Sequence, residues 1–199
     1  MSTRTQTTAP GIRRSWADAH AAVAGTPRWA RVAAYAVPLT VLPSSAWRIA
    51  ACTFHAPILD GGLDAGDTPS GLPGVPIELY VVLLSIASEM LAFTAVGLVA
   101  GWGETFPRWV PRLRGRRVPL LLAVVPGGLG AVMLTLLTTW VAVTYALGLR
   151  IDGGAAPGWL LSFDTWQGTL AVVAYAPLLM WGPLLGAVTF AYWRRRGGS

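Results

Sequence analysis

Four long apolar stretches constrain this chain more than any other feature of its sequence. They cover residues 29–54, 79–103, 118–149 and 165–193, and the last two contain no charged residue. Each reaches the roughly 20 residues that an α-helix needs to cross the roughly 30 Å hydrocarbon core of a bilayer. Because backbone polar groups in hydrocarbon must hydrogen-bond within their own segment, we expect each stretch to form a helix.

The composition of the 199-residue chain agrees with this interpretation. Hydrophobic residues make up 54% and charged residues only 12%, whereas a soluble domain carries about a quarter charged residues. The composition argues against a soluble globular domain, a disordered chain and a disulfide scaffold, and the single Cys52 excludes an intrachain disulfide. We therefore predict an all-α fold: one domain at 29–193, a bundle of four transmembrane helices at about 30–53, 78–103, 119–149 and 165–193. A polar basic tail at 1–28 precedes the bundle, and a short basic tail at 194–199 follows it.

The distribution of Arg residues predicts the orientation of the bundle. All fifteen basic residues are Arg, and thirteen of them lie near the N-terminus, between the second and third stretches, or at the C-terminus. These are Arg4, Arg13, Arg14, Arg28, Arg31, Arg108, Arg112, Arg114, Arg116, Arg117, Arg194, Arg195 and Arg196. The other side has only Arg48 and Arg150, and its connections carry Asp60, Asp64, Asp67, Asp152 and Asp164. Because cytoplasmic connections of membrane proteins are enriched in Lys and Arg, we predict a multi-pass cell-membrane protein with both termini in the cytoplasm.

The charged segments also bear on partners. The connection 108–117 contains five Arg residues, and each is expected to attract anionic lipid head groups by about 1 kcal/mol; docking of an acidic partner protein is the alternative. A formal net charge of +6 would also suit a nucleic-acid-binding protein, but the Arg residues lie at the ends of apolar stretches, so we expect no nucleic acid. His20 and His55 lack metal-ligand spacing, and the chain has no phosphate-binding loop and no H-E-x-x-H motif. We therefore expect no metal and no cofactor.

Two glycine pairs predict where helices pack. Gly97 and Gly101 in the second stretch, and Gly182 and Gly186 in the fourth, are each four residues apart, a spacing that lets another helix backbone approach closely. Both pairs lie near the cytoplasmic ends of helices that run in the same direction, so we expect the second and fourth helices to meet there. The two pairs are also 85 residues apart, which suggests two pseudo-repeated helical hairpins.

Glu89 is the sharpest candidate site residue, because it lies near the middle of the second apolar stretch. A carboxylate at this depth is costly unless it faces the bundle, is paired or is protonated. On a helix, Glu78, Ser85 and Glu89 fall within about 60° of one another, so they form a narrow polar stripe from the outer surface to mid-membrane. One interpretation is a binding site or proton path reached from outside. The other is a neutral Glu89 that hydrogen-bonds a neighbouring helix for packing alone.

Three further residues are candidates for this site. Arg48, near the outer end of the first helix, either snorkels to the membrane interface or forms a salt bridge with Glu78 or Glu89. Thr135 and Thr139 share a face of the third helix. Their hydroxyls either hydrogen-bond Glu89 across helices or bond the carbonyls of their own helix one turn back.

Two segments of the chain resemble a known family. They read W-G-E-x-F-P-R-W at 102–109 and G-R-R-V-P-x-x-x-A-V-V-P at 115–126, and they look like segments of a family of small polytopic, four-helix membrane proteins from actinobacteria, of unknown function. The resemblance covers the four helices but not the N-terminal tail. It implies a cell-membrane location and carries over no catalytic residue, cofactor or ligand.

Two classes of function remain open. The first is a non-enzymatic integral membrane protein, either an accessory subunit or a transporter-like small-molecule binder, with Glu89 as its polar focus. Because four helices are few for a transporter, this class favours a homo-oligomer or a larger membrane complex. The alternative is a membrane-embedded cyclase or isomerase that acts on a lipid-soluble, isoprenoid-like substrate. In that enzyme a protonated Glu89 would be the general acid, and Trp140, Trp181 or Tyr145 would stabilise cationic intermediates.

Overall fold

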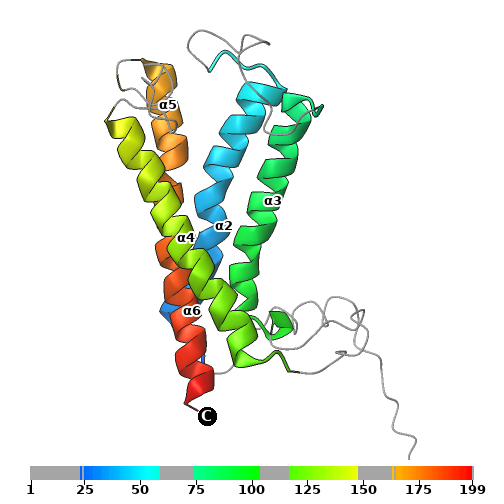
Figure 1. The fold of residues 1–199 in the computed structure, drawn as a ribbon, viewed down its shortest axis with the longest axis vertical. Helices are drawn as coiled ribbons and strands as arrows, with labels where there is room; N and C mark the ends of the chain where they lie inside the picture. The colour runs from blue at the N-terminus through cyan, green and yellow to red at the C-terminus, as the bar shows by residue number, and fades with distance from the viewer. Residues whose placement is uncertain are drawn as a thin grey trace, which may run out of the picture.

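The structure of the chain, a computed structural model, describes residues 23, 25–58, 74–103, 117–147, 163 and 165–198. Within these ranges the chain is all-helical and forms no β-strand (Figure 1), which confirms the predicted fold class for this part of the protein. The α-helices are α2 (Arg28–Arg48), α3 (Ile77–Gly97), α4 (Leu120–Ala146), α5 (Trp166–Tyr175) and α6 (Trp181–Gly197). Three short elements adjoin them: the π-helical η1 (Ile49–Thr53) and the 3-10 helices η2 (Gly101–Gly103) and η3 (Ala176–Met180).

Three helical segments are long and apolar enough to cross a membrane. They are Ile77–Gly97, Leu120–Thr144 and the continuous run Trp166–Gly197 through α5, η3 and α6, and they coincide with the second, third and fourth predicted stretches. The first predicted stretch forms α2 and η1, which are not among these three segments. The coarser prediction of a helical protein with membrane-spanning helices therefore holds for the described part of the chain.

One face of α2 is buried within the bundle, and its other face is exposed. Figure 1 shows α2 between α3 on one side and α5 and α6 on the other, and α2 packs against all three and against η3. Its buried side chains are small or short: Ala30, Ala33, Ala34, Val37, Thr40, Val41, Ser44 and Ser45. Small side chains let neighbouring helices approach closely, so this face of α2 packs closely against α3, α5 and α6.

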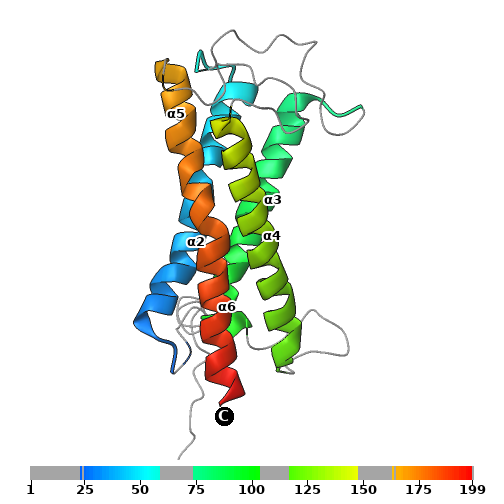
Figure 2. The same cartoon turned by 60° about the vertical axis from the view of Figure 1, so that its left-hand side comes forward.

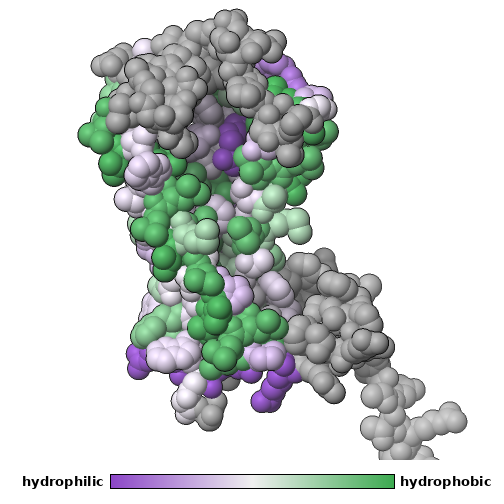
Figure 3. Space-filling model, in the orientation of Figure 1, coloured by the Kyte–Doolittle hydropathy of each residue, from purple (hydrophilic) through white to green (hydrophobic). Residues whose placement is uncertain are grey.

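The most apolar helix, α4, lies at the edge of the bundle. Only 6% of its membrane-length segment is buried, against 28% for each of the other two. Leu121, Leu129, Met133, Leu136 and Trp140 are among its exposed side chains. On the face drawn in Figure 3, hydrophobic side chains are prominent along the middle of the molecule, which suits a helix surface that meets lipid.

The fourth apolar stretch is not one regular helix. Figure 2 shows α5, η3 and α6 following one another along the length of the molecule, and the 3-10 segment between them contains Pro177. Proline cannot donate a backbone hydrogen bond and its ring clashes with the preceding turn, which explains the change of helix type. The helix also continues beyond residue 193, so Arg194, Arg195 and Arg196 form its last turn and do not belong to a separate tail.

The second and fourth apolar stretches do meet near their predicted cytoplasmic ends, where α3 contacts α6 and Val99 packs with Val188, but Gly97 and Gly182 do not face each other there. Gly182 of α6 faces α4 instead, where an added Cβ atom would lie 2.6 Å from the backbone nitrogen of Thr135 and 2.8 Å from the carbonyl oxygen of Ala131. Gly97 faces the Trp102 ring of its own segment, 2.8 Å from a Cβ atom placed there. A glycine pair marks a face that permits close approach but does not specify the partner, and here α4 is the partner of α6.

Arg side chains join the helix ends at one end of the bundle. Arg195 donates to the Thr26 hydroxyl and, at 3.5 Å, to the Leu98 carbonyl oxygen. Arg196 donates to the Val118 carbonyl oxygen at 2.8 Å. The start of α2, the end of α3, the start of α4 and the end of α6 therefore meet, and Figure 3 shows hydrophilic surface at this end.

Several expectations lie outside the described residues. These are most of the N-terminal tail, the connection 108–116 and the acidic connections at 59–73 and 148–162.

Candidate binding site

Polar side chains of α2 and α3 meet within the bundle. Glu89, in the middle of α3, is half-buried. The Ser45 side chain and the Arg48 guanidinium of α2 both lie close enough to its carboxyl group to act on it electrostatically. Ser85 lies one turn before Glu89 on the same face of α3 and is only 2% exposed. We call Ser45, Arg48, Ser85 and Glu89 the polar cluster.

Three atoms of the polar cluster are buried without a hydrogen-bond partner in the described part of the chain. They are Arg48 Nε, Ser85 Oγ and Glu89 Oε1. The Arg48 contact that the structure provides is weak, a 3.4 Å hydrogen bond from Nη2 to Ser45 Oγ, and Arg48 makes no direct ion pair with Glu89. A buried polar atom without a partner costs about 1–3 kcal/mol, so the cluster favours a ligand or water molecules that complete its hydrogen bonds.

Glu78 lies apart from this cluster. Its Oε1 is 4.0 Å from Nε2 of His55, and both side chains are well exposed at the end of the bundle where α3 begins. Of the two predicted partners of Arg48, the structure thus places Glu89 within electrostatic reach and gives Glu78 a different neighbour. The predicted stripe is polar at both ends, but only Ser85 and Glu89 face the interior.

Thr135 and Thr139 of α4, the two predicted site threonines, are not part of the cluster. The Thr135 hydroxyl donates to the Ala131 carbonyl oxygen at 2.7 Å. Of the two predicted alternatives, this is the hydrogen bond within its own helix. Thr139 is exposed. Because α4 packs chiefly against α6 and η3 and not against α3, neither hydroxyl reaches Glu89.

Ser45 is the cluster member that sequence reasoning missed. It lies three residues before Arg48, so the two side chains lie close together on the same side of α2. This spacing was the available signal, but a serine within an apolar helix usually bonds its own backbone. Only the packing of α2 against α3 brings Ser45 to Glu89.

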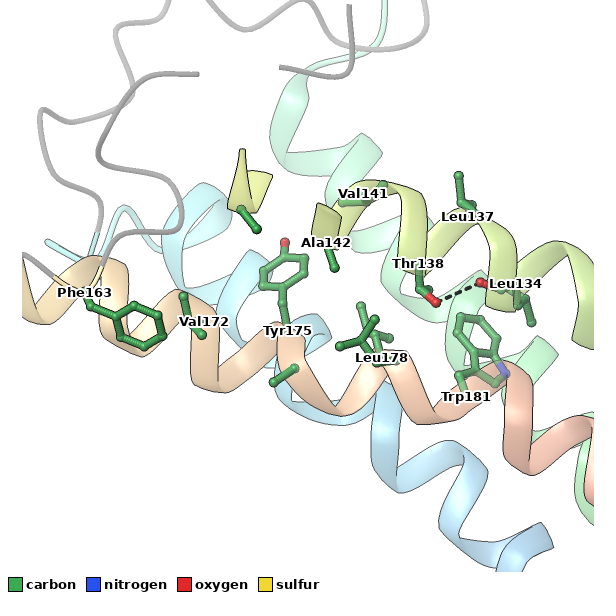
Figure 4. A pocket seen from close by; sticks show the side chains of 13 residues that line it. Leu134, Leu137, Thr138, Val141, Ala142, Phe163, Val172, Tyr175, Leu178 and Trp181 are labelled. Atoms are coloured by element: carbon green, nitrogen blue, oxygen red, sulfur yellow. Dashed lines mark hydrogen bonds between the residues drawn. The ribbon is translucent and has the colours of Figure 1, made fainter. Parts of the chain in front are cut away.

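An apolar pocket of about 420 Å³ lies between α4 and the α5–η3 segment. Figure 4 shows Phe163, Tyr175 and Trp181 along one wall and the α4 side chains along the other. The lining residues are Leu134, Leu137, Thr138, Val141, Ala142, Ala146, Phe163, Val172, Tyr175, Ala176, Leu178, Leu179 and Trp181. The Thr138 hydroxyl donates to the Leu134 carbonyl oxygen at 2.8 Å, so this wall presents mainly hydrocarbon. We call this cavity the α4–α5 pocket.

The aromatic and acidic groups of the enzyme hypothesis are not together. Trp181 lines the α4–α5 pocket, whereas Trp140 is 61% exposed on the outer face of α4. Glu89 is not among the residues that line the pocket. The Tyr145 side chain lies outside the described residues. Within the described part of the chain, no group of three or more His, Cys, Asp or Glu residues is placed to hold a metal ion.

Comparisons with protein-family models, with curated proteins and with solved structures found no match to this chain. The sequence and structure therefore define its class by themselves. It is an all-helical protein, within the described residues, with three segments long and apolar enough to cross a membrane. Inside the bundle it carries a cluster of incompletely hydrogen-bonded polar groups.

Proposed function

We propose that this chain is a multi-pass membrane protein that binds a small molecule at the polar cluster, in the manner of a transporter-like or carrier protein. The observation that carries the proposal is the trio Arg48 Nε, Ser85 Oγ and Glu89 Oε1, all buried and without partners in the described structure. Ionisable residues inside membrane proteins are costly and usually mark ligand or ion sites.

The proposed topology has four crossings and places both termini in the cytoplasm. In this arrangement α2 and η1 cross the membrane beside the three more apolar segments, with one face of α2 packed against α3, α5 and α6 and the other, which includes Val32 and Leu39, exposed to lipid. Seven Arg residues belong to the described segments, and all but Arg48 lie near the end where α2 and α4 begin and α6 ends. That asymmetry supports a cytoplasmic location for this end.

Native mass spectrometry of the detergent-purified protein tests the binding proposal. We expect wild type to retain a small molecule that Glu89→Gln loses, because the amide removes the charge that Arg48 attracts. Ser88→Ala is the matched control, since the Ser88 hydroxyl bonds the Leu84 carbonyl of its own helix at 2.7 Å. If wild type and Glu89→Gln carry the same molecules, Glu89 is structural and the binding proposal fails.

The same spectra report how many chains assemble. We propose a homo-oligomer or a larger complex as the working form, because four helices are few for a transporter. A single mass that corresponds to one chain, in every mild detergent tested, would contradict this. The described geometry gives no observation in favour of the membrane-enzyme alternative.

A further inference from the structure

The α4–α5 pocket ends close to the polar cluster. Trp181 lines the pocket and also packs in a buried cluster with Val41 of α2 and Ala92 of α3. Ser45 follows Val41 by four residues, and Glu89 precedes Ala92 by three. Because α2 and α3 run in opposite directions (Figure 1), both steps lead toward the same end of the bundle, by about 5–6 Å.

The pocket extends toward that same end. Its lining runs from Trp181 to Val172 along η3 and α5, and from Leu134 to Ala146 along α4. The pocket and the polar cluster therefore lie side by side at the same depth, on two sides of the outer half of α2. Figure 3 shows a hydrophilic patch recessed between hydrophobic surfaces in this half of the molecule.

Arg48 lies between the two sites on the surface of α2. Trp47 faces α5, where its ring meets the Tyr175 ring edge-on with centroids 5.5 Å apart, and Tyr175 lines the pocket. Ser45 faces Glu89 of α3. At 100° per residue, Arg48 projects about 100° from Trp47 and about 60° from Ser45, in the interval between them. A head group bound by Arg48 therefore lies within reach of a chain held in the pocket.

The pocket is apolar and the polar cluster carries charged groups. Together they match an amphiphile, which has a hydrocarbon chain and a polar head group. The pocket offers hydrocarbon walls and a volume of about 420 Å³, within the roughly 300–1,000 Å³ range of ligand pockets. The polar cluster offers a cationic donor, Arg48 Nε, and an acidic acceptor, Glu89 Oε1, neither of which has a partner in the described chain. A complementary head group carries an anionic acceptor and a cationic N–H donor.

We infer that the protein binds a single-chain amphiphile, with its hydrocarbon chain in the α4–α5 pocket and a zwitterionic, N–H-bearing head group between Arg48 and Glu89. This inference rests on the proposed function and names its ligand class. The head group satisfies the orphaned atoms of the cluster, and the chain fills a pocket that opens to a hydrocarbon solvent. A ligand held at both ends exchanges more slowly than bulk lipid.

The test is native mass spectrometry of the full-length protein in a nonionic detergent, with lysophosphatidylethanolamine as the probe. Lysophosphatidylcholine of the same chain length is the control, because its head group has the same phosphate but no N–H donor. Since one hydrogen bond to a charged group is worth about 1.5–3 kcal/mol, we expect at least about tenfold tighter binding of the ethanolamine lipid. Equal binding of the two lipids overturns the assigned head group.

Ala142→Trp tests the pocket. Ala142 projects into the pocket from α4 (Figure 4), so the indole ring occupies the space of the chain. Val143→Trp adds the same ring at the next residue, which is 51% exposed and does not line the pocket. We expect the first variant to weaken probe binding about tenfold or more and the second to change it less than about twofold. Ala146→Phe, at the end of α4, provides a second pocket-filling variant if Ala142→Trp does not fold.

The outcomes separate this inference from the proposed function. If Glu89→Gln weakens binding but both tryptophan variants bind like wild type, the ligand does not use the pocket; the amphiphile inference is overturned and the proposed function stands. If neither Glu89→Gln nor the pocket-filling variants change binding, both are overturned. Loss of binding in Glu89→Gln and in Ala142→Trp, but not in Val143→Trp, supports both.

Discussion

Gly182 of α6 lies directly against Thr135 of α4. A Cβ atom at Gly182 would lie 2.6 Å from the Thr135 backbone nitrogen, closer than two such atoms can approach without a shift of the helices. The Thr135 side chain turns its hydroxyl to the Ala131 carbonyl oxygen of its own helix, which keeps this contact free of an unsatisfied polar atom. The contact fixes the crossing point of α4 and α6, the helix pair with the most extensive packing in the described structure.

Gly182→Ala is therefore expected to destabilise the protein. The new methyl group meets helix backbone that cannot rotate away, and such overpacking typically costs about 1–3 kcal/mol. Gly128→Ala is the matched control, because a Cβ atom there meets nothing within 4 Å and alanine stabilises a helix interior by about 0.5–1 kcal/mol relative to glycine. Thermal unfolding in detergent measures both, and a Gly182→Ala variant as stable as wild type would contradict the α4–α6 packing.

The Arg residues at the end of α6 are expected to contribute unequally to stability. Arg196→Gln removes the bond to the Val118 carbonyl oxygen at 2.8 Å, and Arg195→Gln removes the contacts to Thr26 and Leu98. Arg194 instead lies over the Phe190 ring, with its guanidinium carbon 5.9 Å from the ring centroid. We expect each of the first two variants to cost about 1–2 kcal/mol and Arg194→Gln less than about 1 kcal/mol.

Hydrogen exchange locates the effect of these substitutions. Loss of Arg195 is expected to speed exchange at the amide of Val23, which bonds the Val99 carbonyl oxygen at 3.1 Å beside Thr26, while the amides of α5 keep their rates. Uniform acceleration across all helices would show that Arg195 does not hold this end specifically.

The proposed orientation predicts which ends of the helices are accessible from the cytoplasm. In a Cys52→Ser background, Gly198→Cys places a thiol after α6, and Phe54→Cys places one after η1, where Phe54 is 75% exposed. A membrane-impermeant maleimide applied to intact cells is expected to label the second thiol and not the first, and to label both after lysis. The reverse pattern would place the Arg-rich end outside and refute the topology.

Glu89→Met is expected to stabilise the ligand-free protein while it abolishes binding. The thioether has nearly the same length as the acid, fits apolar surroundings, and removes a buried oxygen that has no partner in the described chain. The gain is about 1–3 kcal/mol, the cost of an unsatisfied buried polar group. The unfolding temperature in ligand-free detergent measures it, with Met90→Leu, on the exposed face of the same helix, as the control. A lower unfolding temperature for Glu89→Met would mean that Glu89 serves packing.

The candidate site was partly predictable from local sequence. Glu89 stands out because a carboxyl group is rare in a long apolar stretch, and helical periodicity places Ser85 on its face. For Arg48 the sequence left open whether it snorkels to the interface or pairs with Glu78 or Glu89. Thr135 and Thr139 were assigned to the same site by their shared face, but the structure places α4 against α6 and removes them from it.

Local sequence alone determined the helical class of this protein and the positions of its apolar segments. The length of an apolar stretch, and the need of its backbone groups to hydrogen-bond within the segment in lipid, depend only on neighbouring residues. The break near Pro177 is a local effect too, because proline acts on its own turn. Tertiary structure decided that the small residues of α2 meet α3, α5 and α6, that Gly182 packs on Thr135, and that a pocket forms between α4 and α5. In a helix that is apolar on every face, nothing in the sequence distinguishes the face that meets lipid from the face that meets another helix. That choice depends on the shape of all the helices together.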